Sequence, residues 1–334
     1  MALFFRKRRR PQADVDVEPW KDHAAVSRET AIQTPPGPRR ARFDRDDDDW
    51  DADDEYGMEQ DVTESPALPT PKEPRVFVVV NQKGGVGKTT TTVNIATALA
   101  FGGLNVLVVD IDPQGNASTA LGIDHDPGTP GTYEVLLHNA RIDDLAKQSP
   151  HNSNLHVLPA AIDLSTAELE LVNESGRETR LKRALAAYME QSGVDYVFID
   201  CPPSLGLLTL NALVAATEIM VPIQTEYYAL EGVSQLMRTI HKVKGNLNDN
   251  LELSTVILTM FDNRTNLSHE VAGEVRKHFA TQTLDTEIPR SVRIAEAPSY
   301  GQSVITYYPK SPGAVAYLKA AQEIADAATA EEGN

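Results

Sequence analysis

Apolar residues along this chain alternate between short continuous runs and longer segments with a helical period, and the alternation begins near residue 75. The short runs are rich in valine, isoleucine and leucine, which is typical of strands buried on both faces of a sheet. We predict strands at Val76–Val80, Val106–Val109, Leu155–Leu158, Tyr196–Ile199, Ile219–Ile223, Ser254–Thr259 and around Thr286–Ile288.

Between these strands, apolar residues recur three and four positions apart, which is the spacing of an amphipathic helix. We predict helices at Thr89–Phe101, Arg180–Gln191, Leu207–Ala216, Leu230–Leu247, His269–Ala280 and Gly313–Ala328. Continuous apolar strands that alternate with helices indicate an α/β fold, a mostly parallel sheet covered by helices on both faces. Residues 75–334 are therefore predicted to form one domain.

The first 74 residues have a different character. They contain charge runs at Arg6–Arg10 and Asp44–Glu55, many prolines and no apolar period, so we predict a disordered, charged tail. Phe4 and Phe5 are too few to form a signal peptide, and they precede the basic run instead of following it. Two interpretations of this front end stay open, a solvated arm or a contact with membrane or nucleic acid.

Composition narrows the class of protein. Hydrophobic residues make up 41% of the 334 residues, and the single cysteine, Cys201, excludes a disulfide framework and any four-cysteine metal site within one chain. No apolar stretch approaches the roughly 20 residues of a membrane span, so we expect a soluble, cytoplasmic protein without stable membrane insertion. The net charge is −17, of which residues 1–74 contribute −6 and residues 75–334 contribute −11. Such a body could bind DNA only through a local basic patch.

The segment Lys83–Thr90 carries the clearest chemical signal. It is a glycine-rich turn between a predicted strand and a predicted helix, an arrangement in which backbone N–H groups and the helix dipole can surround a phosphate group. Lys88 would reach the β- and γ-phosphates, and the Thr89 hydroxyl would hold Mg²⁺. The usual pattern has glycine where this chain has Gln82, and the chain places a second lysine, Lys83, at the mouth of the loop. A lysine there is either solvated or directed at a nucleotide, including one held by a partner subunit.

Aspartates follow two other predicted strands. Asp110 and Asp112 end one of them and Asp200 ends another, at the edge of a parallel sheet where ligands bind. Each could be a turn or helix cap, but a neighbouring phosphate loop favours a metal or water role. We predict that Asp200 orders Mg²⁺ through its water shell and that Asp112 positions the attacking water. Asp110 and Asp112 are two residues apart, so on an extended strand they would share a face.

Around these residues the chain resembles the ParA family of partition ATPases, which belongs to the deviant P-loop class shared with MinD and the nitrogenase iron protein. The resemblance spans roughly residues 75–325 and implies a SIMIBI-type P-loop NTPase fold. It is carried by five segments: Lys83–Thr90, Asp110–Asn116, Asp200–Gly206, Thr259–Asn266 and Ile288–Gly301.

The resemblance also implies a role for individual residues. Lys83 matches a signature lysine that reaches the partner's nucleotide in an ATP-sandwich dimer, and Asp112 matches the catalytic aspartate. The metal would be served by Thr89, Asp112 and Asp200. Arg264 and Arg290 align with arginines implicated in DNA binding. The nucleotide-binding residues that it implies are Lys83, Gly84, Gly85, Val86, Gly87, Lys88, Thr89, Thr90, Met260, Pro289, Arg290, Glu296 and Pro298.

The function implied by the resemblance is a slow ATPase of chromosome partition with ATP and Mg²⁺ as cofactors. Its ATP-bound homodimer would bind DNA non-specifically on the nucleoid, and a ParB-type partner would stimulate hydrolysis and release. The alternative is a MinD-like or cargo-positioning ATPase that acts on a membrane or protein scaffold. The chain departs from the iron protein in its lone Cys201 and from MinD in its acidic, alanine-rich C-terminal end. Residues 1–74 cannot supply the folded repressor domain of some plasmid members.

Overall fold

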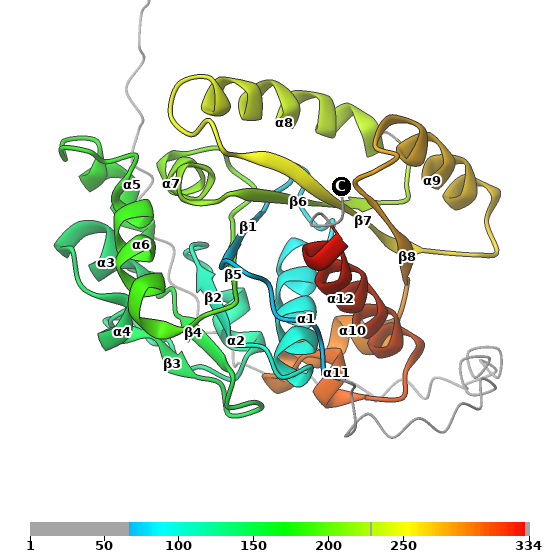
Figure 1. Ribbon diagram of the computed structural model, residues 1–334, viewed down its shortest axis with the longest axis horizontal. Coiled ribbons are helices and arrows are strands. Elements are labelled where there is room, and N and C mark those ends of the chain that lie inside the picture. Colours follow the sequence, from blue (N-terminus) through cyan, green and yellow to red (C-terminus); the bar gives the residue numbers. More distant parts are fainter. Residues whose placement is uncertain (1–66, 228, 331–334) are drawn as a thin grey trace, which may run out of the picture. The chain divides into compact units, whose positions relative to one another are not determined.

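A computed structural model describes residues 67–227 and 229–330, which are built around a sheet of eight described strands (Figure 1). The strand order is β3-β4-β2-β5-β1-β6-β7-β8, and all neighbouring strands are parallel except β3 and β4. The strands are β1 (Arg75–Val79), β2 (Val106–Asp110), β3 (Lys147–Gln148), β4 (Leu155–Leu158), β5 (Tyr196–Asp200), β6 (Glu218–Gln224), β7 (Glu252–Phe261) and β8 (Thr283–Pro289). Because β1 lies between β5 and β6, the loop after β1 opens near the middle of the carboxyl edge.

Alternate residues of β1 belong to two separate hydrophobic cores, one on each face of the sheet. Val76 and Val78 belong to the core packed by helices α3 to α9, whereas Phe77 and Val79 belong to the core packed by α1, α2 and the C-terminal helices. The first face carries α3 (Thr132–His138), α4 (Ile142–Leu145), α5 (Leu164–Leu171), α6 (Arg180–Ser192), α7 (Leu207–Ala215), α8 (Ala229–Lys244) and α9 (Asn266–His278). The second carries α1 (Lys88–Phe101), α2 (Asn116–Ala120), α10 (Val292–Glu296), the 3₁₀ helix η3 (Ala297–Tyr300), α11 (Val304–Tyr307) and α12 (Pro312–Ala330).

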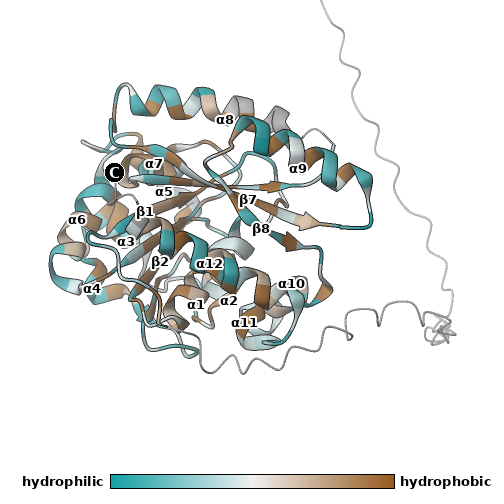
Figure 2. Cartoon of the chain, turned by 45° about the vertical axis from the view of Figure 1, so that its right-hand side comes forward, coloured by the Kyte–Doolittle hydropathy of each residue, from teal (hydrophilic) through white to brown (hydrophobic). Residues whose placement is uncertain are grey.

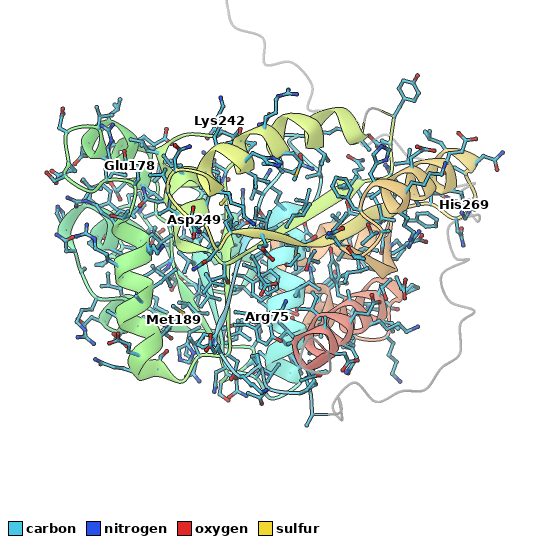
Figure 3. The ribbon with its side chains drawn as sticks, turned by 45° about the horizontal axis from the view of Figure 1, so that its top comes forward. Arg75, Glu178, Met189, Lys242, Asp249 and His269 are labelled. Carbon is cyan, nitrogen blue, oxygen red and sulfur yellow. The ribbon has the colours of Figure 1, made fainter. Side chains whose placement is uncertain are left out.

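The outer faces of the helices are hydrophilic and the strands between them are hydrophobic, as Figure 2 shows. Lys242 on α8 and His269 on α9 are exposed on that outer surface (Figure 3). The sheet is therefore covered on both faces, and the prediction of an α/β fold with a mostly parallel sheet is confirmed.

Every predicted strand and helix is present, with ends that differ by a few residues. α9 begins three residues earlier than predicted because Thr265 caps it and accepts a hydrogen bond from the Ser268 N–H. Seven further short elements were not predicted: β3, α2, α3, α4, α5, α10 and α11, together with η3. None of them exceeds eight residues, so none is long enough to display a helical or strand period clearly.

Packing onto the domain begins before residue 75. The Leu68 N–H donates to the Gly102 carbonyl oxygen (2.9 Å), and the Leu68 side chain lies where a Cβ on Gly102 would be, 2.4 Å from Leu68 Cγ. Pro71 is buried as well. The predicted boundary at residue 75 is therefore several residues late. The rest of the predicted tail, residues 1–66, lies outside the described residues.

In the part of the chain that the structure describes, no helix combines the length and the apolar character that a membrane crossing requires.

Candidate functional site

The loop between β1 and α1 is shaped as a cradle with its backbone N–H groups available. Gly85 and Gly87 have φ angles of +74° and +86°, a left-handed conformation that favours glycine. Gly87 is the N-cap of α1, and no side chain caps the helix there. A Cβ added at Gly84 or Gly85 would meet no atom within 4 Å, so this side of the loop is open. The first N–H groups of α1 are thus left for a ligand.

Polar contacts fix the loop to the sheet from both sides. The Asn81 amide donates to the Pro222 carbonyl oxygen (2.8 Å), and its own oxygen accepts from the Lys83 N–H (3.1 Å). On the other side the Thr259 hydroxyl of β7 donates to the Val86 carbonyl oxygen (2.9 Å). The cradle is therefore held in shape by side chains from outside the glycine motif.

The predicted phosphate and magnesium residues converge beneath this loop. The Thr89 hydroxyl donates to Asp200 Oδ2 (2.7 Å), and the Thr92 hydroxyl one helical turn later donates to Asp200 Oδ1 (3.2 Å). Lys88 is only 8% exposed, and burial lowers the pKa of its ammonium while the negative charge of Asp200 opposes that shift. A hydroxyl, a carboxylate and a lysine therefore share one enclosed corner of the loop.

Two buried carboxylates lie side by side at the ends of β2 and β5. Asp110 and Asp200 are register partners, and both are fully buried. Burial raises the pKa of both carboxyl groups, and the charge of Asp200 raises that of Asp110 further. Asp110 Oδ2 is occupied by the N–H (2.9 Å) and the hydroxyl (2.8 Å) of Ser118. Asp110 is thus a structural anchor for α2, with no access to solvent.

Asp112 occupies a different position from the one predicted. β2 ends at Asp110, so Asp112 lies in the following turn and does not share a strand face with Asp110. Its N–H donates to Asp110 Oδ1 (3.2 Å), and its own Oδ1 accepts from the Gln114 N–H (3.0 Å). Its charge also raises the pKa of Asp200, which places Asp112 on the same side of the site.

Lys83 stands at the open mouth of the loop, and the carboxylate that it contacts is Glu226. Lys83 Nζ lies 3.5 Å from Glu226 Oε2, with 41% of the lysine side chain exposed. Arg290 approaches the other oxygen of the same carboxylate at 3.2 Å, and Gln224 donates to it too. The sequence analysis missed Glu226, because nothing in the local pattern Gln224–Tyr227 distinguishes a site residue from a turn.

Polar groups and space at the loop fit a nucleotide with its magnesium ion. The loop is open above Gly84 and Gly85, and the buried Gln82 Nε2 has no hydrogen-bond partner among the described residues. No group of three or more histidine, cysteine or acidic side chains in the described ranges could hold a metal ion by itself. A magnesium ion would therefore depend on Thr89, water and phosphate oxygens, with Asp200 behind them.

Comparison with known proteins agrees with this geometry. Residues 74–253 match the AAA domain family. The chain is 50% identical over 251 residues to the sporulation initiation inhibitor protein Soj of Bacillus subtilis, an alignment that covers 75% of this chain and 98% of that protein. It is also 50% identical over 250 residues to the chromosome partitioning protein ParA of Caulobacter vibrioides, covering 75% and 93%. The chain belongs to the ParA/Soj family of P-loop ATPases.

Solved structures support the same fold. Cobyrinic acid a,c-diamide synthase from Mycobacterium smegmatis with bound ADP and magnesium is 39% identical with a TM-score of 0.66, covering 78% of this chain and 97% of that one. The cell division ATPase MinD of Pyrococcus furiosus is 27% identical with a TM-score of 0.63, covering 76% and 99%. The predicted P-loop fold is confirmed.

The ParA resemblance also predicted an adenine-side loop, and the structure assembles part of it. Met260 has a φ of +52°, and the adjacent Phe261 pairs with Pro289 at the end of β8. The Arg290 N–H donates to the Phe261 carbonyl oxygen (3.0 Å). Met260, Pro289 and Arg290 are therefore brought together. Glu296 and Pro298 lie further along, in α10 and η3, where η3 packs against α2.

The two arginines predicted to contact DNA lie beyond the ends of β7 and β8. Arg264 is 76% exposed and contacts both oxygens of Asp262, at 3.1 and 3.2 Å. The hydrogen bonds from Arg264 lower the pKa of Asp262, and the charge of Arg290 lowers it further, so the two arginines are close in space. Their role in DNA binding stays a prediction. Cys201 is buried, which agrees with its interpretation as a small core residue.

Proposed function

We propose that this ParA-family chain binds ATP with Mg²⁺ in the glycine loop and hydrolyses it as the switch of a chromosome-partition system. The observation that carries the proposal is the 2.7 Å hydrogen bond from Thr89 to Asp200 beneath the loop, next to the buried Lys88. Relatives solved with ADP or an ATP analogue and magnesium support the choice of cofactors.

Each residue of the loop has a separate task in this chemistry. Magnesium, when bound, would neutralise negative charge on the β- and γ-phosphate oxygens. Lys88 donates to those oxygens, and the N–H groups of the open loop donate beside it. Asp200 holds the Thr89 hydroxyl in place, which keeps its lone pairs turned toward the ion. Asp112 Oδ1 is engaged by Gln114, so we assign the other oxygen, Oδ2, to the attacking water.

The mechanical part of the proposal concerns two subunits. Lys83 leaves Glu226 and reaches the nucleotide of a second copy, which makes dimerisation depend on ATP. The dimer binds DNA without sequence preference through Arg264 and Arg290, a ParB-type partner stimulates hydrolysis, and intrinsic turnover is slow. Binding held by γ-phosphate contacts is lost when the γ-phosphate leaves.

Lysine variants test the nucleotide and dimer steps separately. Lys88→Ala should abolish ATP binding, because it removes a charge-assisted phosphate contact. Lys83→Ala should bind ATP as a monomer but fail to dimerise. Fluorescent-nucleotide titration and light scattering with ATP measure the two steps. A Lys83→Ala protein that dimerises normally would refute the in-trans role.

A second candidate function is a positioning ATPase that acts on a protein scaffold or membrane, which the net charge of −11 on residues 75–334 favours. Binding to random-sequence DNA with ATP at two salt concentrations separates the candidates. A DNA-binding dimer should lose affinity with a slope of about −0.9 per phosphate contact in a log–log plot. Absence of ATP-dependent DNA binding would favour the scaffold function.

A further inference from the structure

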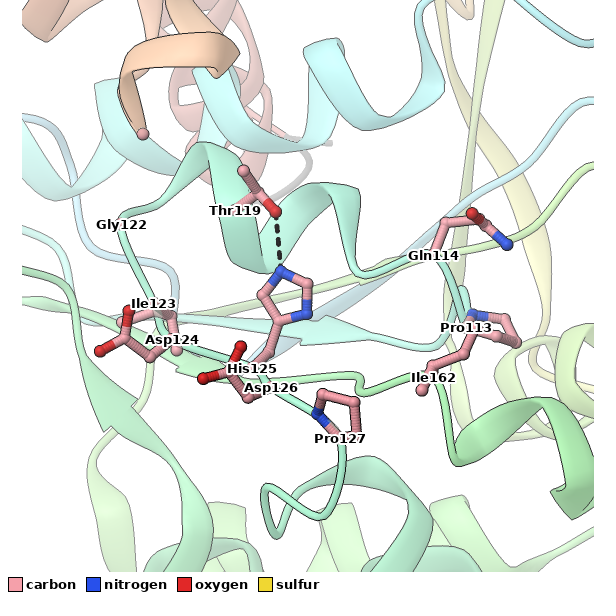
Figure 4. A pocket seen from close by; sticks show the side chains of 11 residues that line it. Pro113, Gln114, Thr119, Gly122, Ile123, Asp124, His125, Asp126, Pro127 and Ile162 are labelled. Carbon is pink, nitrogen blue, oxygen red and sulfur yellow. Dashed lines mark hydrogen bonds between the residues drawn. The ribbon is translucent and has the colours of Figure 1, made fainter.

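A hollow separate from the glycine loop lies beside the turn that follows β2. It is a cavity of about 530 Å³ between α2, the turn after α2, and the more distant Ile162 and Gly301. Pro113 and Gln114 form one wall, and Figure 4 shows them across from the turn that carries His125. A volume of roughly 300–1,000 Å³ suits a small ligand or a few side chains.

The lining of this cavity is negatively charged. Asp124 and Asp126 are exposed at its rim, and neither carboxylate forms an ion pair with a residue of the described ranges. None of the eleven lining residues is lysine or arginine. Lys147 donates to the Asp124 carbonyl oxygen (2.9 Å), so one ammonium does lie outside the lining. Two carboxylates facing the hollow disfavour a phosphate-bearing ligand and favour a cationic one.

The remaining chemistry of the lining favours a side chain over a metal ion. Asp124, His125 and Asp126 are consecutive, but the described chain contains no group of three such side chains that could hold a metal. Ile162 is 47% exposed, and Pro113 adds apolar surface on the same wall. An apolar wall next to acidic groups suits arginine or lysine, which bury an aliphatic stem and keep a charged head in water.

Contacts from this cavity run directly to the Asp112 turn. The Thr119 hydroxyl and His125 Nε2 are 2.7 Å apart (Figure 4), and the imidazole lies against Gly115, where an added Cβ would be 2.4 Å from His125 Cε1. The Gly115 N–H in turn donates to the Asp112 carbonyl oxygen (2.9 Å). A ligand that fixes His125 would therefore restrain the backbone that carries Asp112.

We infer that this cavity binds a basic segment of a partner protein, with an arginine or lysine head at Asp124 and Asp126 and aliphatic surface on Ile162. Occupation of the cavity holds His125 against Gly115 and so orders the Asp112 turn. The binding site stands on the cavity and its charge. Only the effect on hydrolysis rests on the proposed function.

A direct binding assay on the full-length, nucleotide-free protein tests the site. The probe is a fluorescein-labelled peptide of four Arg-Leu repeats, and its control has glutamate in place of arginine. Asp124→Lys/Asp126→Lys should weaken binding of the Arg-Leu peptide at least tenfold in fluorescence anisotropy. The matched control is Asp144→Lys/Asp249→Lys, which makes the same change in net charge at exposed positions in α4 and after α8 (Figure 3). It should bind within about twofold of wild type.

Several results would overturn the assignment. Equal weakening in the two double variants would show that only net charge matters, and absence of binding to the wild type would remove the site. Self-association that the rim variant loses would assign the cavity to a second copy of the chain.

Single-turnover hydrolysis tests the link to Asp112. Saturating Arg-Leu peptide should accelerate wild-type turnover severalfold and leave the rim variant unchanged. His125→Ala should still bind the peptide, because both rim carboxylates remain, but should lose the acceleration. Peptide binding without any acceleration of an active ATPase would refute the coupling. A protein that binds the peptide but hydrolyses no ATP at all would refute the proposed function instead.

Discussion

Removal of the short segment that leads into β1 should destabilise the domain without touching its site. The segment 67–74 contributes one backbone hydrogen bond, from Leu68 to Gly102 (2.9 Å), together with the half-buried Leu68 side chain and the buried Pro71. A hydrogen bond contributes about 1 kcal/mol net. A fully buried leucine contributes about 1.5–3 kcal/mol, so a half-buried one contributes about 1 kcal/mol. With Pro71 the loss comes to about 2–3 kcal/mol.

Two truncations measure this loss. A protein that begins at residue 67 keeps the segment, and one that begins at residue 75 lacks it. We expect the shorter protein to melt about 5–10 °C lower, since 1 kcal/mol shifts the Tm of a domain of this size by about 2–4 °C. Gly102 lies at the far end of the 14-residue α1 from the glycine loop, so nucleotide binding at 20 °C should be equal in both. Equal melting temperatures would refute the assigned packing and restore the boundary at residue 75.

The remaining predictions concern the site. Asp112→Ala should bind ATP and dimerise but hydrolyse at least about 10²-fold more slowly in single-turnover assays, whereas turnover within a few-fold of wild type would move the water-positioning role elsewhere. Asp200→Asn should change how stability depends on pH. The folded chain keeps protons on Asp110 and Asp200 that the unfolded chain releases, so wild-type stability from this pair is lost as the pH rises from about 5 toward the raised pKa values. Urea unfolding in EDTA should therefore show the variant gaining about 1 kcal/mol or more on wild type between pH 5.5 and 8, and a pH-independent difference would contradict this. Glu226→Gln should tighten ATP-dependent DNA binding by up to about fivefold, because exposed ion pairs contribute at most about 1 kcal/mol and this carboxylate contacts two of the proposed functional cations. Weaker DNA binding in that variant would show that the carboxylate orders those cations for binding.

Hydrophobic pattern was sufficient to predict the sheet and the six longer helices, because each of those elements has a buried face that repeats several times. The shorter elements have no such repetition. α2 covers five residues, and it is held by the two hydrogen bonds from Ser118 to Asp110, a tertiary contact that the pattern of the segment does not reveal. Sequence reasoning therefore predicts the frame well and the connections around the site poorly.

The same limit applies to the functional residues. Spacing correctly placed Thr89 and Asp200 at one point, since both follow adjacent parallel strands, β1 and β5. It failed for Asp112, because the residue at which a strand ends is decided by the fold and not by the apolar run. It could not find Glu226, since that contact joins residues 143 positions apart in the sequence.

The charges at this edge of the sheet are arranged at a cost to the isolated domain. Two adjacent carboxylates are fully buried at Asp110 and Asp200, and burial disfavours their charged forms as it disfavours the charged form of Lys88. A domain selected for stability alone would fill these positions with apolar side chains, as it does along the rest of β2 and β5. Asp110 has a structural use in holding α2, but Asp200 and Lys88 gain their full set of partners only from a polyanionic ligand with its cation. The electrostatic strain is thus concentrated where the glycine loop is open, and that is the physical reason to place the chemistry there.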